Sequence, residues 1–429
     1  MLRISQLKLP VEHTEAQLKK KLLKTAHIKE QDLKQFFIRK RSVDGRKKPE
    51  LYYVYTVDLI VANEEHVKKI SKGKLQTVQE KNYHIPEHGA KKLRKRPVVI
   101  GSGPSGLFCA YLLAFEGYEP LVIERGAPVR ERQKVVEQFW KDGILNTASN
   151  VQFGEGGAGT FSDGKLNTLV KDKFGRNRFV LETFVKFGAP EEILWESKPH
   201  IGTDILKDVV ASIRKEIESL GGEVHFRTKV CDILCEDIAG IKEDEAGKVH
   251  EQEITAGRQN SQIKGLLIEK DSVRTKYPCR NVIFAIGHSA RDTFYMLHEK
   301  KLFMTPKAFA IGVRVEHPAY LINESQYGKE YPEELPTASY KLTHQCESTG
   351  RGIYSFCMCP GGYVVNSSSE KGRLCVNGMS YHDRAGRNSN TALITTVTPE
   401  DFWNFNVSMR NLLIKSEMER FRYSFLEIS

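Results

Sequence analysis

The fold is decided by the stretch Pro97-Val98-Val99-Ile100-Gly101-Ser102-Gly103-Pro104-Ser105-Gly106. Its apolar start predicts a short buried strand, and its glycines predict a tight turn into the apolar helix that follows. A second apolar strand, Leu121-Val122-Ile123, ends in Glu124, eighteen residues after Gly106. This order of strand, glycine turn, helix, strand and acid is typical of a dinucleotide-binding site.

Each residue of that pattern has a physical task. Gly101 permits the tight turn, Gly103 lets the backbone approach a pyrophosphate, and Gly106 lets the helix pack closely on the strand. The helix N-terminus offers free N–H groups and a partial positive charge to phosphates. Glu124 stands where an acid would meet ribose hydroxyls. A glycine-rich turn without a ligand is the alternative, and the surrounding strands, helix and acid favour a nucleotide cofactor.

Length and composition describe a globular chain. Its 429 residues suffice for two or three domains with buried cores. The first ten residues contain no continuous apolar core of the signal-peptide type, and the longest apolar run, 107–115, is far too short to span a membrane. The eight cysteines form no Cys-x-x-Cys pair and predict neither a zinc site nor a disulfide framework. We therefore expect a cytoplasmic protein without a membrane segment.

The positive charge is concentrated at the N-terminus. Residues 1–97 hold 24 Lys and Arg against 11 Asp and Glu, so the whole net charge of +11 belongs to this segment. Its cations would pair with nucleic-acid phosphates, and its strand aromatics would stack on bases if they face outward. Strand aromatics usually pack inward, so association with RNA or tRNA is the alternative and not the leading hypothesis. These aromatics are Phe36, Phe37, Tyr52, Tyr53 and Tyr55.

The segment 1–80 is predicted to form a small α/β domain of ferredoxin-like arrangement. A strand at 3–9, a helix capped by Thr14, and strands at 35–39 and 51–61 around a turn at 43–48 give this order. Residues 81–96 are predicted to be a basic linker.

The chain after Glu124 does not alternate strands and helices as an NAD dehydrogenase would. A long excursion, 127–200, precedes a helix at 204–220, a strand at 223–226 and another at 281–287; the polar stretch 236–265 is predicted to be a hairpin or insertion. This interrupted layout is typical of flavin-binding Rossmann folds. The predicted fold class is α/β. Its parts are a Rossmann-like FAD-binding domain of glutathione-reductase type at 97–300, an inserted substrate or cap domain at 301–400 and an atypical tail at 401–429.

A second glycine-rich segment, 152–164, contains four glycines within six residues and would allow the backbone to lie against a flat ring or a phosphate. Candidate catalytic residues stand elsewhere. His288 and Arg291 follow the late strand and could stabilise a reduced flavin or a substrate anion, although a capped helix with solvated charges is an equal alternative for His288. Arg314 projects from a strand at 310–318, and His382 is suited to proton transfer. Their spacing defines no catalytic unit and no metal site.

Five motifs together resemble a bacterial family of uncharacterised FAD-dependent dehydrogenases, from the first residue to about residue 400: 101–106, 122–126, 150–165, 309–315 and 377–381. The resemblance implies FAD, with NAD(P)H as a conceivable transient electron donor and a small-molecule substrate that the family does not define. It implies pyrophosphate contacts near the first turn, a ribose contact at Glu124, adenine contacts by the Val230 strand, and flavin contacts at the second glycine segment. The implied residues are Gly101, Gly103, Pro104, Ser105, Gly106, Glu124, Arg125, Gly157, Gly159, Thr160, Val230 and Gly287.

One departure from the family concerns the C-terminus. Family members supply a late Gly-Asp segment near the flavin, whereas this chain has no Gly-Asp dipeptide and contains no glycine after about Asn404. A shortened or altered chain that binds FAD weakly, or a non-catalytic form, is therefore a further hypothesis. A disulfide reductase is disfavoured because Cys109 stands alone on the helix after the glycine turn.

Overall fold

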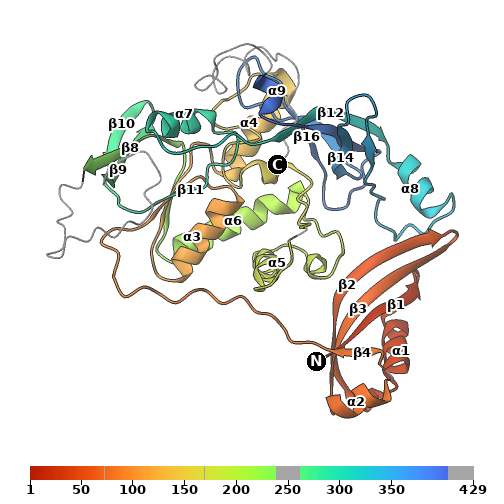
Figure 1. Ribbon diagram of the computed structural model, residues 1–429. Coiled ribbons are helices and arrows are strands. Elements are labelled where there is room, and N and C mark those ends of the chain that lie inside the picture. The colour runs from red at the N-terminus through yellow and green to blue at the C-terminus, as the bar shows by residue number, and fades with distance from the viewer. Residues whose placement is uncertain (72, 169, 238–260, 404–429) are drawn as a thin grey trace.

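The computed structural model describes residues 1–429 except 72, 169, 238–260 and 404–429 (Figure 1). Most of the hairpin or insertion predicted at 236–265 and nearly all of the tail predicted at 401–429 therefore lie outside the described residues. Within the described ranges, no helix has both the length and the apolar character needed to cross a bilayer.

The N-terminal region folds into a four-stranded antiparallel sheet of order β2-β3-β1-β4 with two helices. This strand order and the chain order β-α-β-β-α-β are those of the ferredoxin-like arrangement that the sequence predicts. The elements are β1 (Leu2–Pro10), α1 (Glu15–Ala26), the 3₁₀ turn η1 (Glu30–Asp32), β2 (Leu33–Lys47), β3 (Glu50–Val61), α2 (Glu64–Ile70) and β4 (Leu75–Thr77).

Local signals explain where these elements begin and end. Thr14 caps α1 as predicted: its hydroxyl accepts a bond from the Gln17 N–H at 3.3 Å, and the Gln17 side chain accepts one from the Thr14 N–H at 2.8 Å. Tyr53 and Tyr55 are buried in the core of this domain and are not available for base stacking. The turn predicted at 43–48 is wrong, because β2 continues to Lys47 and the chain reverses just after it.

The centre of the molecule is a parallel sheet of order β11-β5-β6-β7. Side chains alternate between its faces: Val99 and Val122 pack against α3 and α6, whereas Val98, Ile100 and Ile123 pack against the antiparallel sheet β10-β9-β8. Burial on both faces explains why these strands are continuously apolar. The bounds are β5 (Val98–Ile100), α3 (Pro104–Phe115), β6 (Leu121–Ile123), α6 (Thr203–Ser219), β7 (Glu223–His225), β8 (Thr228–Asp237), β9 (Ser261–Lys270), β10 (Val273–Tyr277) and β11 (Val282–Phe284).

The excursion after β6 covers the sheet edge with short elements. They are α4 (Val129–Asp142), the 3₁₀ turn η2 (Ala158–Phe161), α5 (Arg176–Lys186) and the 3₁₀ turn η3 (Glu191–Leu194). The glycine-rich segment 152–164 follows α4 and contains η2, and its bonds to Arg132 and Ser102 show that it is not a free surface loop.

A third region is built on an antiparallel sheet of order β12-β17-β14-β13, with the ribbon β15-β16 beside it. Figure 1 shows α8 between this sheet and the tip of β2, and Tyr327 of α8 packs into the core of the N-terminal domain. The elements are β12 (Phe309–Pro318), α8 (Ala319–Tyr327), β13 (Thr343–Gln345), β14 (Gly352–Cys359), β15 (Tyr363–Asn366), β16 (Val376–Met379), β17 (Asn388–Val397) and α9 (Glu400–Trp403). The helix before them, α7 (Arg291–Glu299), packs through Met296 into the core of the parallel sheet.

Candidate cofactor site

The glycine turn between β5 and α3 is shaped by two glycines that tolerate no side chain. Gly101 has a φ of +99°, and a Cβ placed on it would overlap the carbonyl oxygen of Ala285 at the end of β11. A Cβ on Gly106 would overlap the carbonyl oxygen of Gly101. Gly103 differs: its φ is −69°, and the nearest heavy atom to a Cβ there is the Cα of Gly157, 3.8 Å away. The space above Gly103, at the N-terminus of α3, is open.

Glu124 lies beside this turn at the end of β6, with only 5% of its surface exposed. Its Oε2 accepts bonds from the N–H and the hydroxyl of Ser102, both at 2.8 Å, and its Oε1 accepts one from the N–H of Gly126 at 2.8 Å. Three protein donors thus fix the carboxylate. Because a carboxylate oxygen can accept two bonds, Oε1 retains capacity for one further donor, such as a hydroxyl.

The glycine-rich segment lies directly against the dinucleotide turn, although about fifty residues separate them in the chain. The N–H of Gly156 donates to the carbonyl oxygen of Ser102 at 2.9 Å. Gly157 has a φ of +63°, and a Cβ on it would come within 2.9 Å of the Cα of Gly103. Gly159 faces Pro104 across a wider gap, 3.9 Å from an added Cβ. The structure therefore brings together the two segments that the sequence singled out.

A fully buried arginine, Arg132 of α4, holds this segment in shape. Its guanidinium donates to the carbonyl oxygens of Asn150 (2.8 Å), Val151 (2.8 Å), Gly154 (3.3 Å) and Glu155 (2.6 Å). Burial lowers the pKa of Arg132 to about 10 against the opposing charge of two carboxylates, so the group stays protonated at neutral pH. The sequence analysis missed Arg132, which stands in an ordinary amphipathic helix and belongs to no motif.

Glu155 ties the same segment to two helices. Its side chain is fully buried, Oε2 accepts from the N–H of Val129 at the start of α4 (2.7 Å), and Oε1 accepts from Nε of Arg214 in α6 (2.7 Å). A carboxylate at a helix N-terminus is stabilised by the free N–H groups there. The signal that could have found Glu155 is its position as the one acid within the run of four glycines.

Two of the predicted cofactor residues turn their side chains into the protein. Thr160 is fully buried; its hydroxyl donates to the carbonyl oxygen of Glu155 at 3.4 Å, and its own carbonyl oxygen accepts from the Thr203 hydroxyl at 2.6 Å. Val230 is buried in β8 opposite Ile268. Only backbone atoms of these two residues could face a ligand.

The remaining predicted cofactor residues lie towards α7. Arg125 stacks over the ring of Phe153, with 4.5 Å to the centroid, and pairs with Asp292 at 2.9 Å. Burial would raise the pKa of Asp292, but bonds from Arg125 and Lys229 outweigh it and bring the pKa to about 2. Gly287 is exposed, with a φ of +68° and open space where a Cβ would stand.

The four predicted catalytic residues occupy three separate places. His288 and Arg291 follow the end of β11, where Arg291 pairs with Glu370 at 3.0 Å. Arg314 lies in the antiparallel sheet on β12. His382 lies near the start of α6, with Nδ1 3.1 Å from the carbonyl oxygen of Ile201. They do not form one catalytic unit.

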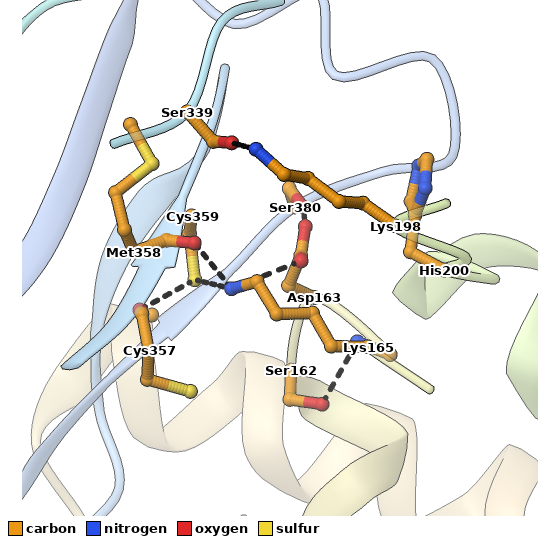
Figure 2. Close-up of polar contacts among 12 residues, drawn as sticks. Ser162, Asp163, Lys165, Lys198, His200, Ser339, Cys357, Met358, Cys359 and Ser380 are labelled. Atoms are coloured by element: carbon orange, nitrogen blue, oxygen red, sulfur yellow. Dashed lines mark hydrogen bonds and ion pairs between the residues drawn. The ribbon is translucent and has the colours of Figure 1, made fainter. Parts of the chain in front are cut away.

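A buried polar cluster joins the end of the glycine-rich segment to the antiparallel sheet (Figure 2). Asp163, 2% exposed, accepts from Arg384 at 2.5 and 3.0 Å and from the Ser380 hydroxyl, and pairs with Lys165 at 3.2 Å. Burial would raise the pKa of Asp163, but the charges of Lys165 and Arg384 outweigh it and bring the pKa to about 2. Lys165 also lies 3.8 Å from Sγ of Cys359, whose pKa burial raises to about 11.

The cluster carries more positive than negative charge. Lys198 donates to the Ser339 hydroxyl at 2.6 Å, and burial together with the charge of Arg384 lowers the pKa of Lys198. Within the described ranges Lys198 makes no ion pair. His200 stacks on the ring of His382 at 5.2 Å, and burial lowers the pKa of His200 to about 4, so it is neutral at pH 7.

A separate cavity of about 620 Å³ lies between the N-terminal domain and the excursion. Two of the cations that line it form ion pairs: Arg39 with Asp58 at 2.8 Å and Lys19 with Glu30 at 2.5 Å. Its lining consists of Glu15, Lys19, Leu33, Lys34, Gln35, Phe36, Phe37, Ile38, Arg39, Arg178, Glu191, Leu194 and Trp195.

Comparison with protein families gives three matches. Residues 308–426 match the C-terminal-domain-like model of FAD-dependent proteins, residues 99–129 match an NAD(P)-binding Rossmann-like domain, and residues 1–60 match a domain of unknown function. The first match extends through 404–426, a segment that the sequence analysis set apart as unlike the family.

Among curated proteins, the chain is similar to an uncharacterised protein of Clostridium beijerinckii, with 44% identity over 408 residues, covering 94% of this chain and 70% of that protein. Solved structures with lower similarity include the glycerol-3-phosphate dehydrogenase of Bacillus halodurans complexed with FAD (12% identity, TM-score 0.32, 71% of this chain and 48% of that chain). They also include a flavoprotein/dehydrogenase of Cytophaga hutchinsonii (12%, 0.32, 73% and 58%). These two likenesses are too low to transfer an activity.

Proposed function

Since this chain belongs to a family of FAD-dependent oxidoreductases, we propose that it is a dehydrogenase whose bound flavin accepts a hydride or electrons from a small-molecule substrate. The observation that carries the proposal is the turn at Gly103, which has room for a methyl group beside Gly157 and lies next to Ser102, whose N–H is held by the buried carboxylate of Glu124. The substrate and the electron acceptor are not defined by these residues. NAD(P)H as a transient electron donor remains part of the proposal.

The residues around that space fit FAD. The N-terminus of α3 would stabilise the pyrophosphate, since Gly103 adds no side chain there. Glu124 would accept a bond from a ribose hydroxyl through Oε1. Gly157 and Gly159 would let the backbone approach the flavin ring. When bound, FAD supplies the redox chemistry, and the protein supplies position and electrostatics.

The substrate would approach from the side of the antiparallel sheet. The polar cluster around Asp163 and Lys165 links the second glycine segment to β14, and its excess positive charge favours an anionic substrate. We also propose a cytoplasmic location, because the described residues contain no disulfide, which suits a reducing compartment.

The test is FAD binding by Gly103→Ala. A methyl group at this position meets no protein atom closer than 3.8 Å, so the variant should fold normally. It would nevertheless occupy the place of the pyrophosphate and weaken charged hydrogen bonds worth about 1.5–3 kcal/mol, a loss of roughly 10- to 100-fold in FAD affinity. Gly89→Ala, at another site where a Cβ meets nothing, is the matched control and should bind FAD as the parent does.

The readout is the visible absorbance of purified protein after FAD titration, with circular dichroism to verify folding. A parent protein that stays colourless with added FAD would overturn the proposal. Equal FAD affinity in the Gly103→Ala and Gly89→Ala variants would show that the cofactor does not lie at this turn. The nucleic-acid alternative predicts retention on heparin that weakens with rising salt.

A further inference from the structure

We propose that Arg314 and Asn390 form a binding site for a carboxylate group, so that the substrate of this enzyme is a carboxylic acid. The inference rests on the proposed function, because it names the substrate class of that site. Its basis is a pair of buried hydrogen-bond donors, one on each residue, for which the described part of the chain provides no acceptor.

The two residues lie on the same face of the antiparallel sheet. Arg314 of β12 stands opposite Ala392 of β17, and Asn390 is two residues from Ala392 along the same strand. Side chains two apart in a strand share a face. Asn390 also stands opposite Cys359 of β14, so the three side chains converge under the β15-β16 ribbon.

The guanidinium of Arg314 is only partly used by the protein. Its Nη1 donates to Oδ1 of Asn390 at 2.5 Å and to the carbonyl oxygen of Cys357 at 3.2 Å. Its Nε is buried, and no protein atom within the described ranges accepts a bond from it. Nε lies on the edge with which an arginine binds a carboxylate by two parallel hydrogen bonds.

The amide of Asn390 points its other end away from the arginine. Its Oδ1 must face Nη1, because only the oxygen can accept a bond, and this leaves Nδ2 with no acceptor among the described residues. Asn390 is fully buried. A buried donor without a partner costs about 1–3 kcal/mol, and such groups are rare in native proteins. Two of them on adjacent side chains indicate that a ligand supplies the acceptors.

The charges nearby favour an anion as that ligand. Arg314 makes no ion pair with any residue that the structure describes, and the nearest carboxylate along its own strand, Glu316, is exposed and accepts from Asn388 at 2.6 Å. Lys165 lies on the other side of Cys359, and its carboxylate partner, Asp163, already pairs with Arg384. An incoming carboxylate would therefore neutralise an uncompensated cation.

A glycine of the β15-β16 ribbon packs directly against these side chains. A Cβ on Gly378 of β16 would collide with Nη1 of Arg314 and Oδ1 of Asn390, and would lie 2.6 Å from Sγ of Cys359. Any side chain at Gly378 would displace the arginine from its present position. Lys165 contacts Cys359 of the same layer and belongs to the chain just after the segment that would contact the flavin, which connects this site with the proposed cofactor site.

The experiment is titration of the FAD-loaded protein with benzoate and with uncharged benzamide, read by the flavin absorbance spectrum and by the rise in melting temperature. Benzoate should bind and benzamide should not. Arg314→Met should weaken benzoate at least tenfold without loss of bound FAD, and Arg314→Lys should restore part of the affinity. Arg46→Met, at an exposed arginine paired with Asp44, is the control and should bind benzoate as the parent does.

A second variant keeps the test valid if Arg314→Met does not fold. In Asn390→Asp the new carboxylate would pair with Arg314, so this variant should melt higher than the parent and lose benzoate binding. Unchanged benzoate affinity in both variants, or no binding of benzoate by FAD-loaded parent protein, would overturn the inference. Failure of the parent to take up FAD would instead refute the proposed function, and the two failures are thereby distinguished.

Discussion

The arrangement of the second glycine segment depends on Arg132, and replacing this residue is the sharpest test of how the site is held together. In Arg132→Met the side chain keeps much of its volume and loses every donor. Four buried carbonyl oxygens, at residues 150, 151, 154 and 155, would then lose the guanidinium as a donor. Gly154 keeps the bond from the Gly157 N–H and Glu155 keeps the bond from the Thr160 hydroxyl, so among the described residues only the oxygens at 150 and 151 are left without a donor.

The magnitude follows from that count. A buried acceptor left without a partner costs about 1–3 kcal/mol, so two of them give about 2–6 kcal/mol. The bond to Gly154 is long, at 3.3 Å, and removal of a buried charge returns part of the cost. We therefore expect Arg132→Met to lower the free energy of unfolding by roughly 4 kcal/mol, a large share of the 5–15 kcal/mol typical of a domain.

The assay is urea unfolding followed by tryptophan fluorescence, because Trp140 of α4 packs edge-on against Phe161 next to the segment. Arg130→Met is the matched control: it lies on the same helix, its side chain is 66% exposed, and its ion pair with Asp208 is on the surface. It should cost about 1 kcal/mol or less. Arg132→Lys, with one compact donor group, should recover only part of the loss. Equal stability of the Arg132→Met and Arg130→Met variants would refute this account of the segment.

Three further predictions concern the Thr14 helix cap, the loss of stability at acid pH and the reactivity of the cysteine thiols. Thr14→Ala should lower the stability of the N-terminal domain by about 1 kcal/mol in urea unfolding, and Thr14→Ser should not. With folded-state pKa values of about 4 for His200 and about 2 for Asp163, below the ordinary 6.5 and 3.8, both groups stabilise the fold at neutral pH. The melting temperature should therefore fall as pH drops from 6.5 towards 4, where His200 becomes protonated, and again from 3.8 towards 2, where Asp163 does. In a series of melting curves Asp163→Asn should flatten the second fall. An unchanged second fall would contradict its assignment to Asp163. Hydrogen bonds from Ser348 and Thr349 lower the pKa of Cys346 to about 7, so iodoacetamide at neutral pH should modify Cys346 long before Cys359, as peptide mass mapping would reveal.

Local sequence patterns predicted the fold well in segments that have one clear hydrophobic period. The strands Val98–Ile100 and Leu121–Ile123 are apolar on both faces because the sheet is covered on both sides. Their continuous runs of apolar residues predicted this burial. The ferredoxin-like order followed from alternation and from the Thr14 cap. The reversal after Lys47 was misplaced because β2 continues as a strand through a polar, glycine-containing stretch whose composition is typical of a turn.

The sequence predicted the two glycine segments of the site but not how they contact each other. Glycine spacing identified Gly103 and Gly157, yet their contact depends on Arg132 and Glu155, whose bonds run to backbone atoms of a distant segment. Bonds to backbone atoms carry no sequence signature, so no motif points to Arg132, and Glu155 stands out only as the one acid within the run of four glycines. For the same reason Thr160 was expected beside a ligand, whereas its hydroxyl bonds to a carbonyl oxygen inside the segment.

Charge composition counts cations without their partners, so it does not by itself decide the nucleic-acid alternative. Three of the N-terminal arginines, Arg3, Arg39 and Arg41, pair with Asp58 or with Glu196 of the excursion, and Arg41 thereby joins the basic domain to the rest of the molecule. Arg314 belongs to a region of nearly balanced composition, but its buried Nε has no acceptor in the described chain. The functional content of a charge therefore depends on whether the fold gives it a partner, and the buried Nε of Arg314 without an acceptor is the reason why we propose the anion site in the antiparallel sheet.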